Sequence, residues 1–374
     1  DNTSFGRRSL STNTTGSENT AIGTQALALN LTGSDNVAMG YNAGLSVTTG
    51  IQNTLIGTQA GDALTDADDN VAVGKSALSG DTLGSNSVAV GQATLANQNF
   101  TTATDSNNVA VGYNAGNAVT TGINNTIIGA LAGDALTDAD YNVAVGTEAL
   151  GTDTLGNRSV AIGRKALATQ NFTTATSAYN VAMGYNAGVL ITTGVQNTII
   201  GSLSGDALTD ADFNTVLGYN ALSTETLGSR SVAIGFQALL DQNFTTATDN
   251  YNVAVGYNAG TNVTTGIKNT IIGGLAGDSL NDADFNVALG YQALSFDQKG
   301  NNSVAIGHQA LTTQRFATST DSYNVAVGAQ AGQEVTTGVN NVLIGGLAGD
   351  ALTTGGANVA IGYKALSTED GHGS

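Results

Sequence analysis

The chain has 374 residues, of which only 11% are charged, and its 29 acidic and 11 basic side chains give a net charge of −18. This balance disfavours a nucleic-acid partner, because phosphate binding needs a basic surface. Cysteine is absent, which excludes disulfides and thiolate metal sites, and no apolar run approaches the ~20 residues of a membrane helix, so no membrane insertion is expected.

A five-residue motif recurs along the whole chain: Asn or Ser, an apolar residue or Thr, an apolar residue, a large aliphatic residue, and Gly, as in Asn-Val-Ala-Met-Gly at residues 36–40. Successive motif glycines are 17 residues apart, but the step after Gly91, Gly163, Gly235 and Gly307 is 21 residues. Four units therefore form a super-repeat of 72 residues, and the motif occurs 21 times.

Each unit is too short for a helical repeat, which needs 30 or more residues. The alternation of large and small residues in Val-Ala-Val-Gly is typical of a strand. A second extended segment is expected three to six residues beyond the motif glycine, as at residues 26–29, before turn residues such as Thr48-Thr49-Gly50. Because one unit cannot bury a core, the sequence predicts an all-β parallel β-solenoid of 21 stacked rungs. We expect one continuous array over residues 1–366 and a polar tail at residues 367–374.

The motif strand is apolar on both faces, which normally means that both faces are covered. We expect Val37 and Met39 to point into the coil and Ala38 to point outward. An outward apolar stripe along the array would exceed what a monomer tolerates, so the sequence predicts a parallel homotrimer with a seam along its axis. The expected seam residues are Ala38, Leu55, Ala72, Ala110, Ile127, Ile199, Ile271 and Leu343.

Asn stands four residues before the motif glycine in most rungs, and Ser stands there in the four rungs that precede a 21-residue step. Stacked rungs would place these amides in a column of hydrogen bonds along the axis. The alternative is that Asn favours the turn that enters the strand. Both interpretations make these residues structural.

An acidic segment recurs in four super-repeats, beginning with Asp62-Ala63-Leu64-Thr65-Asp66. Clustered carboxylates suit calcium, whereas solvated turns with Asx hydrogen bonds are the simpler alternative. The calcium candidates are Asp62, Asp66, Asp68, Asp134, Asp138, Asp140, Asp206, Asp210, Asp212, Asp278, Asp282 and Asp284.

The 21-residue rungs carry an insertion with one aromatic residue and several hydroxyls. Such a loop could bind a sugar ring, or its Phe could fill a corner of the coil or lie between chains. The receptor-contact candidates are Phe100, Phe172, Phe244 and Phe316. Tyr41, Tyr113, Tyr185 and Tyr257 recur at one matched position and are expected to pack or to lie on the surface.

No catalytic constellation stands out, because the histidines are His308 and His372 and neither is repeated. The sequence therefore predicts no enzyme and no cofactor, with calcium as the one candidate ligand. Ice binding would need a Thr array on every rung, whereas Thr-Thr-Gly is prominent in one rung type of four.

The segments Arg158 to Gly163 and Asn302 to Gly307 resemble the head repeat of YadA-like trimeric autotransporter adhesins, and the Asn-Thr-Ile-Ile-Gly variant is similar to repeats of phage tail-fibre proteins. The resemblance implies a left-handed parallel β-roll and a parallel trimer. The rungs are a few residues longer than the adhesin family's, and the 72-residue super-repeat is not part of that pattern, which favours the tail fibre.

The sequence thus predicts the structural shaft of a trimeric fibre for host or surface attachment, located in a virion tail fibre. The alternative is a bacterial surface adhesin or extracellular filament whose repeated loops bind a host-surface glycan or receptor. Since neither end shows a recognisable cap, we expect a longer natural polypeptide or end-to-end filaments.

Overall fold

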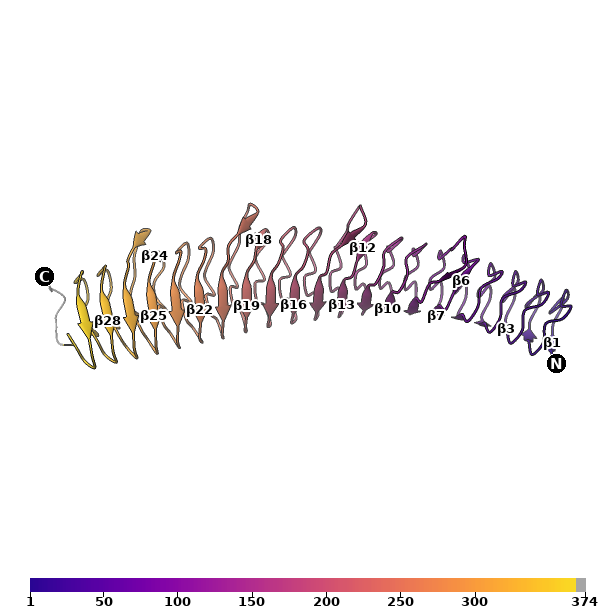
Figure 1. The fold of residues 1–374 in the computed structure, drawn as a ribbon, viewed down its shortest axis with the longest axis horizontal. Helices are drawn as coiled ribbons and strands as arrows, with labels where there is room; N and C mark the ends of the chain where they lie inside the picture. Colours follow the sequence, from indigo (N-terminus) through magenta and orange to yellow (C-terminus); the bar gives the residue numbers. More distant parts are fainter. Residues whose placement is uncertain (368–374) are drawn as a thin grey trace. The chain divides into compact units, whose positions relative to one another are not determined.

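The computed structural model describes residues 1–367 of the chain as two compact parts, Asp1–Asn186 and residues 187–367, each considered by itself. In both parts the motif forms three-residue strands (Figure 1). In the first part these motif strands are β1 (Thr3–Phe5), β2 (Thr20–Ile22), β3 (Val37–Met39), β4 (Thr54–Ile56), β5 (Val71–Val73), β7 (Val88–Val90), β9 (Val109–Val111), β10 (Thr126–Ile128), β11 (Val143–Val145), β13 (Val160–Ile162) and β15 (Val181–Met183). In the second part they are β16 (Thr198–Ile200), β17 (Thr215–Leu217), β19 (Val232–Ile234), β21 (Val253–Val255), β22 (Thr270–Ile272), β23 (Val287–Leu289), β25 (Val304–Ile306), β27 (Val325–Val327), β28 (Val342–Ile344) and β29 (Val359–Ile361).

Within each part the motif strands pair in parallel with the strand of the next rung, and equivalent residues face each other. Ala38 pairs with Leu55 in the first part, and Ala254 pairs with Ile271 in the second. The prediction of an all-β parallel β-solenoid of about 21 turns with a 17-residue period is therefore confirmed.

The 21-residue rungs add short parallel strand pairs away from the motif strands, in loops that extend beyond those of their neighbours (Figure 1). These pairs are β6 (Gly84–Ser85) with β8 (Thr104–Asp105), β12 (Gly156–Asn157) with β14 (Thr176–Ser177), β18 (Gly228–Ser229) with β20 (Thr248–Asp249), and β24 (Gly300–Asn301) with β26 (Thr320–Asp321). The predicted tail at residues 367–374 lies, from residue 368 on, outside the described residues.

The second extended segment predicted at residues 26–29 is wrong. The chain turns there, and alternate residues lie in the left-handed region, with φ of 61° at Gln25 and 48° at Leu27. The backbone groups are still satisfied from rung to rung, because the Leu27 N–H donates to the Ala43 carbonyl over 3.0 Å. Residues in the left-handed region alternate here with residues outside it, so the rung turns tightly while its backbone keeps the hydrogen bonds along the axis.

The predicted orientation of the motif strand is also wrong: the two faces are reversed. Ala38 is fully buried within the single chain, whereas its neighbour Met39 is 40% exposed. All the residues expected to form the seam are likewise at 0% exposure and belong to the core of the coil, namely Ala38, Leu55, Ala72, Ala110, Ile127, Ile199, Ile271 and Leu343.

The reversal follows from the narrowness of the coil, which leaves room for one large side chain where two rungs meet. The Leu55 side chain lies against Gly61 of its own rung and Gly44 of the rung before, and a Cβ on either glycine would come within 2.7 Å of a Leu55 methyl carbon. The rungs of Ala21 and Ala72, which lie on either side of this pair of rungs, have a buried leucine at the position of Gly44, namely Leu27 and Leu78. A large core residue therefore stands at one of the two positions but not at both in these rungs, and the other large aliphatic residues of the motif point outward.

Candidate functional site

The outward face of the motif strands is an apolar surface that continues from rung to rung in each part. Two strand positions point outward in each rung, one and three residues before the motif glycine, and Met39, Leu217 and Leu289 are 40%, 44% and 40% exposed. Val, Thr, Ile and Leu fill most of the other outward positions and are partly exposed in strands such as β5, β19 and β22. Each part therefore carries an unpartnered aliphatic stripe on a parallel sheet, although parallel sheets are normally covered on both faces.

Two further columns border this stripe, and each contributes one residue to a rung. The leading rim is the residue five before the motif glycine, and the trailing rim is the residue just after it. In the second part both rims are rich in aromatic and cationic side chains. The leading rim there includes Phe213, Arg230, Tyr251, Lys268, Phe285 and Tyr323, and the trailing rim includes Tyr219, Phe236, Tyr257, Tyr291 and His308.

Side chains within each rim stack from rung to rung in the second part. On the trailing rim, Phe236 lies between Tyr219 and Tyr257 with ring centroids 5.7 and 5.3 Å apart. On the leading rim, the Arg230 guanidinium lies 4.7 Å from the ring centroid of Phe213 and 5.8 Å from that of Tyr251. These contacts order both borders of the stripe by stacking and cation–π attraction.

In the first part the rims are more polar and differ in charge. The leading rim carries the exposed acids Glu18, Asp35 and Asp69, while the trailing rim carries the exposed Lys75. Tyr41, Tyr113 and Tyr185, which the sequence placed at matched positions, are trailing-rim residues and are 52%, 52% and 46% exposed, as is Tyr257 in the second part at 58%. Their prediction as packing or surface residues holds for the surface.

The asparagine column predicted from the sequence is confirmed. Asn36 Oδ1 accepts two hydrogen bonds from Asn53, one from its backbone N–H over 3.0 Å and one from its side-chain amide over 3.1 Å. The Asn53 amide also donates to the Ala67 carbonyl over 2.7 Å. The side chains are fully buried, so the column satisfies backbone groups at the strand entry as well as linking successive rungs.

The sequence analysis missed a buried carboxylate in the rung that precedes each 21-residue rung. Asp81 Oδ1 accepts the backbone N–H of Gly84 and of Phe100, each over 3.1 Å, and its Oδ2 accepts Gln98 Nε2 over 2.6 Å. Gln98 Oε1 in turn accepts Asn108 Nδ2 over 2.9 Å, and the three side chains are fully buried. This network replaces the asparagine column where Ser87 is too short to continue it.

The network recurs in the other super-repeats with the same connections. Its members are Asp153, Gln170 and Asn180; Glu225, Gln242 and Asn252; and Asp297, Gln314 and Asn324. A sequence signal was available: seven residues after the motif glycine, successive rungs read Val, Leu, Asp, Gln, as at Val47, Leu64, Asp81 and Gln98, and all four are fully buried.

The four phenylalanines predicted as receptor contacts are buried, so that prediction is wrong and the structural alternative is correct. Their exposures are between 5% and 7%, for Phe100, Phe172, Phe244 and Phe316. A Cβ on Gly228 would come within 2.8 Å of Phe244 Cδ2, because the ring packs directly over that glycine of the preceding rung. The insertion therefore closes a corner of the coil.

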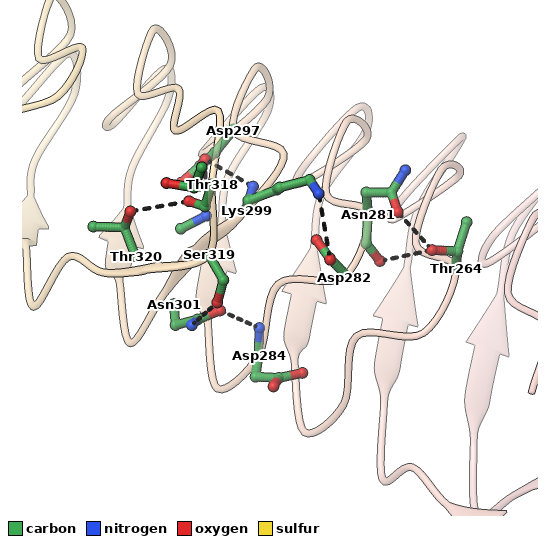
Figure 2. Close-up of polar contacts among 11 residues, drawn as sticks. Thr264, Asn281, Asp282, Asp284, Asp297, Lys299, Asn301, Thr318, Ser319 and Thr320 are labelled. Carbon is green, nitrogen blue, oxygen red and sulfur yellow. Dashed lines mark hydrogen bonds and ion pairs between the residues drawn. The ribbon is translucent and has the colours of Figure 1, made fainter.

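The acidic segments do not converge on a metal site: no group of three or more His, Cys, Asp or Glu side chains in residues 1–367 is placed to hold an ion. In the last of them (Figure 2), Asp282 pairs with Lys299 over 3.5 Å, and the Asp284 N–H donates to Asn301 Oδ1 over 2.9 Å. Asp284 Oδ1 also accepts the Ile267 N–H over 2.8 Å. These are the Asx-type contacts of the alternative interpretation, directed to adjacent rungs.

The first aspartate of each segment is partly buried, and desolvation raises the pKa of Asp62, Asp134, Asp206 and Asp278. A backbone hydrogen bond partly offsets the shift in each case, and the Ser295 hydroxyl does so for Asp278. Asp206 Oδ1 is buried without a hydrogen-bond partner. Across residues 1–367, no helix has the length and apolar character of a membrane span.

Comparison with known families and proteins agrees with this architecture. The model of the YadA head domain repeat matches residues 83–104, 155–176, 287–310 and 299–320, which all include the insertions of 21-residue rungs or their flanks. The curated proteins give no match to the chain. YadA head repeats are structural adhesin domains that are exposed at the cell surface, so the comparison supports the surface-adhesin alternative better than the tail fibre. The chain is a parallel β-solenoid, and parts of it match the YadA head domain repeat.

Proposed function

We propose that the chain is the structural segment of a trimeric, adhesin-like fibre at a cell surface, held together along the outward face of its motif strands. The observation that carries this proposal is the uncovered aliphatic stripe that the motif strands present in both parts of the chain. Heads of the YadA family trimerise, and a second and third copy would cover this stripe.

The width of the face suits three copies. From the leading rim to the trailing rim the chain advances six residues, three of them in the motif strand, which span at most ~20 Å at ~3.3 Å per residue. Three such faces around an axis would each lie ~6 Å from it, close to half the ~10 Å spacing of packed sheets. Four faces would stand ~10 Å from the axis and leave a channel that the Val and Ile side chains do not fill.

The role is mechanical. Backbone hydrogen bonds along each coil and an apolar seam between coils would stiffen the segment, so that it spaces or presents other parts of the fibre. The buried phenylalanines argue against the alternative in which the insertion loops bind a receptor directly. No enzymatic role is proposed, because the buried asparagines and the Asp81-type networks that recur inside the coil take part in hydrogen bonds that stack the rungs.

The experiment is the mass of the native particle in solution, by light scattering and native mass spectrometry. A particle of three times the 37.3 kDa chain supports the proposal. A stable monomer at micromolar concentration would overturn it, since the stripe would then remain exposed. Surface display of the chain should place it outside the cell without conferring attachment, whereas attachment by the segment alone would contradict the spacer role.

A further inference from the structure

We propose that the two rims of the outward face recognise each other between copies, so that the leading rim of one chain lies against the trailing rim of the next, rung by rung. This inference rests on the proposed trimer and adds which residues meet. The partner is a second copy of this chain, in parallel orientation and in register.

The geometry of a closed ring leads to this pairing. When identical sheets surround an axis that runs along their stacked strands, the end of each strand approaches the beginning of the neighbour's strand. The leading rim lies at the beginning and the trailing rim at the end, so each boundary between copies brings one rim of each kind together. In a parallel, in-register trimer, equivalent rungs of the three chains lie at the same level along the axis. The leading-rim residue of a rung in one chain therefore meets the trailing-rim residue of the equivalent rung in the next chain.

Charge complementarity supports the pairing in the first part of the chain. Asp69 and Lys75 flank β5, the first on the leading rim and the second on the trailing rim. Both are exposed, and within residues 1–367 neither takes part in an ion pair of its own chain. Within one chain the three strand residues of β5 lie between them, with bends at Asp69 and Gly74. Between copies they would meet as opposite charges.

Side-chain chemistry in the second part is matched in another way. The rungs of β17 and β21 each have an aromatic residue on both rims, Phe213 with Tyr219 and Tyr251 with Tyr257. In the rung between them, Arg230 on the leading rim faces Phe236 on the trailing rim, which is a cation–π combination.

One rung of the first part carries like charges on its two rims, Arg158 and Arg164. There each guanidinium already lies over tyrosine rings of adjacent rungs: Arg158 is 5.2 Å from the Tyr141 ring centroid, and Arg164 is 5.7 Å from that of Tyr185. When equivalent rungs of the copies lie at the same level, tyrosine rings of the adjacent rungs therefore flank this pair of arginines along the axis.

The test uses cysteine pairs, because the natural chain has no cysteine that would confuse the result. The D69C/K75C double variant is oxidised, or treated with a short bis-maleimide, at the concentration where the native mass is measured. The pairing predicts covalent trimers on a denaturing gel. Mixing separately labelled D69C and K75C single variants during refolding should give linked heterodimers, while each single variant alone stays unlinked.

A register control is the D69C/Y41C variant, whose two sites lie two rungs apart and should not cross-link. A trimeric mass without a D69C/K75C link, a link in either single variant, or a link in the register control would overturn the rim pairing and leave the trimer intact. A monomeric mass would instead overturn the proposed function, so the two failures are distinct. Because both sites are exposed, the substitutions leave the core of the coil unchanged.

Discussion

Gln98 donates a hydrogen bond from Nε2 to Oδ2 of Asp81, 17 residues earlier, over 2.6 Å, and neither side chain is exposed to solvent. The bond joins two rungs inside the coil, where the carboxylate also receives two backbone N–H groups. A buried carboxylate without a cationic neighbour is stable only when its oxygens are satisfied in this way. This buried network and the outward face of the motif strands can both be tested by substitution.

The first prediction concerns the third copy of this network. Glu225 accepts the backbone N–H of Gly228 over 2.7 Å and of Phe244 over 3.0 Å, besides Gln242 Nε2. Glu225→Leu keeps an apolar side chain in the coil but leaves these buried donors unpaired, at about 1–3 kcal/mol each. We expect a loss of at least ~3 kcal/mol in urea unfolding and faster hydrogen exchange at the Gly228 and Phe244 amides. The matched control is Asp241→Leu, an exposed acid nearby; equal stability of the two variants would contradict a structural role for the network.

The second prediction tests the packing that reverses the strand faces. Gly44 has φ of +59°, and an added Cβ would come within 2.7 Å of Leu55 Cδ1 and 2.9 Å of Leu27 Cδ2. We expect Gly44→Ala to cost about 2–4 kcal/mol, from the left-handed backbone and from overpacking. Gly274→Ala is the control, because its nearest neighbour would be Tyr291 Cδ2 at 3.6 Å. Thermal unfolding of both variants measures the difference, and a Gly44 variant as stable as the control would show that the coil has spare room there.

The third prediction concerns pH. Burial raises the pKa of Asp206 above its ordinary value of 3.8, so the ionised form is disfavoured in the folded chain. Its contribution is neutral below the ordinary value and becomes destabilising as the pH rises through the raised pKa. Asp206→Asn should therefore unfold at a higher temperature than the natural chain near pH 7 and at the same temperature near pH 3. A stabilisation of Asp206→Asn that persists near pH 3 would refute the electrostatic explanation.

The fourth prediction separates the outward face from the rest of the surface. Ile234 points outward from β19 at the centre of the proposed seam, and Leu190 is 47% exposed away from the motif strands. Ile234→Asp should abolish the trimer, because a desolvated carboxylate on the seam costs several kcal/mol in each copy. Leu190→Asp should leave assembly intact. Native mass and circular dichroism together report this, and a folded Ile234→Asp trimer would place the seam elsewhere.

Some features of the fold could be predicted from the sequence and others could not, depending on the physical constraint that acts on each residue. The regular spacing of glycines such as Gly40 and Gly57 predicts the parallel stacking, because only one register aligns identical motifs. The prediction of which strand face is buried was wrong. The alternation of Ala38 and Met39 fits either orientation, and the larger residue was expected inside. Volume decides it instead: Leu55 fits only because Gly44 and Gly61 are small, a relationship between rungs that no single motif reveals.

The candidate site was less predictable for a related reason. The sequence around Phe244 is typical of an exposed loop with one aromatic residue. The Phe244 ring is nevertheless buried, because Gly228 of the preceding rung has no side chain and leaves a corner for the ring. The Asp81 network likewise joins Asp, Gln and Asn residues from different rungs, so it becomes visible only when rungs are aligned in columns. The rims depend on the strand orientation and could be assigned only after the structure had corrected it.

The buried order Val, Leu, Asp, Gln has a consequence for how such a gene can change in length. Loss of the unit that carries the carboxylate would leave the partner amide unpaired, and a unit gained between the two would separate them, so selection would remove both changes. Loss or gain of 72 residues restores every neighbour. Unequal recombination between copies would therefore be tolerated in steps of four turns, so that natural variants of this protein should differ in length by whole super-repeats.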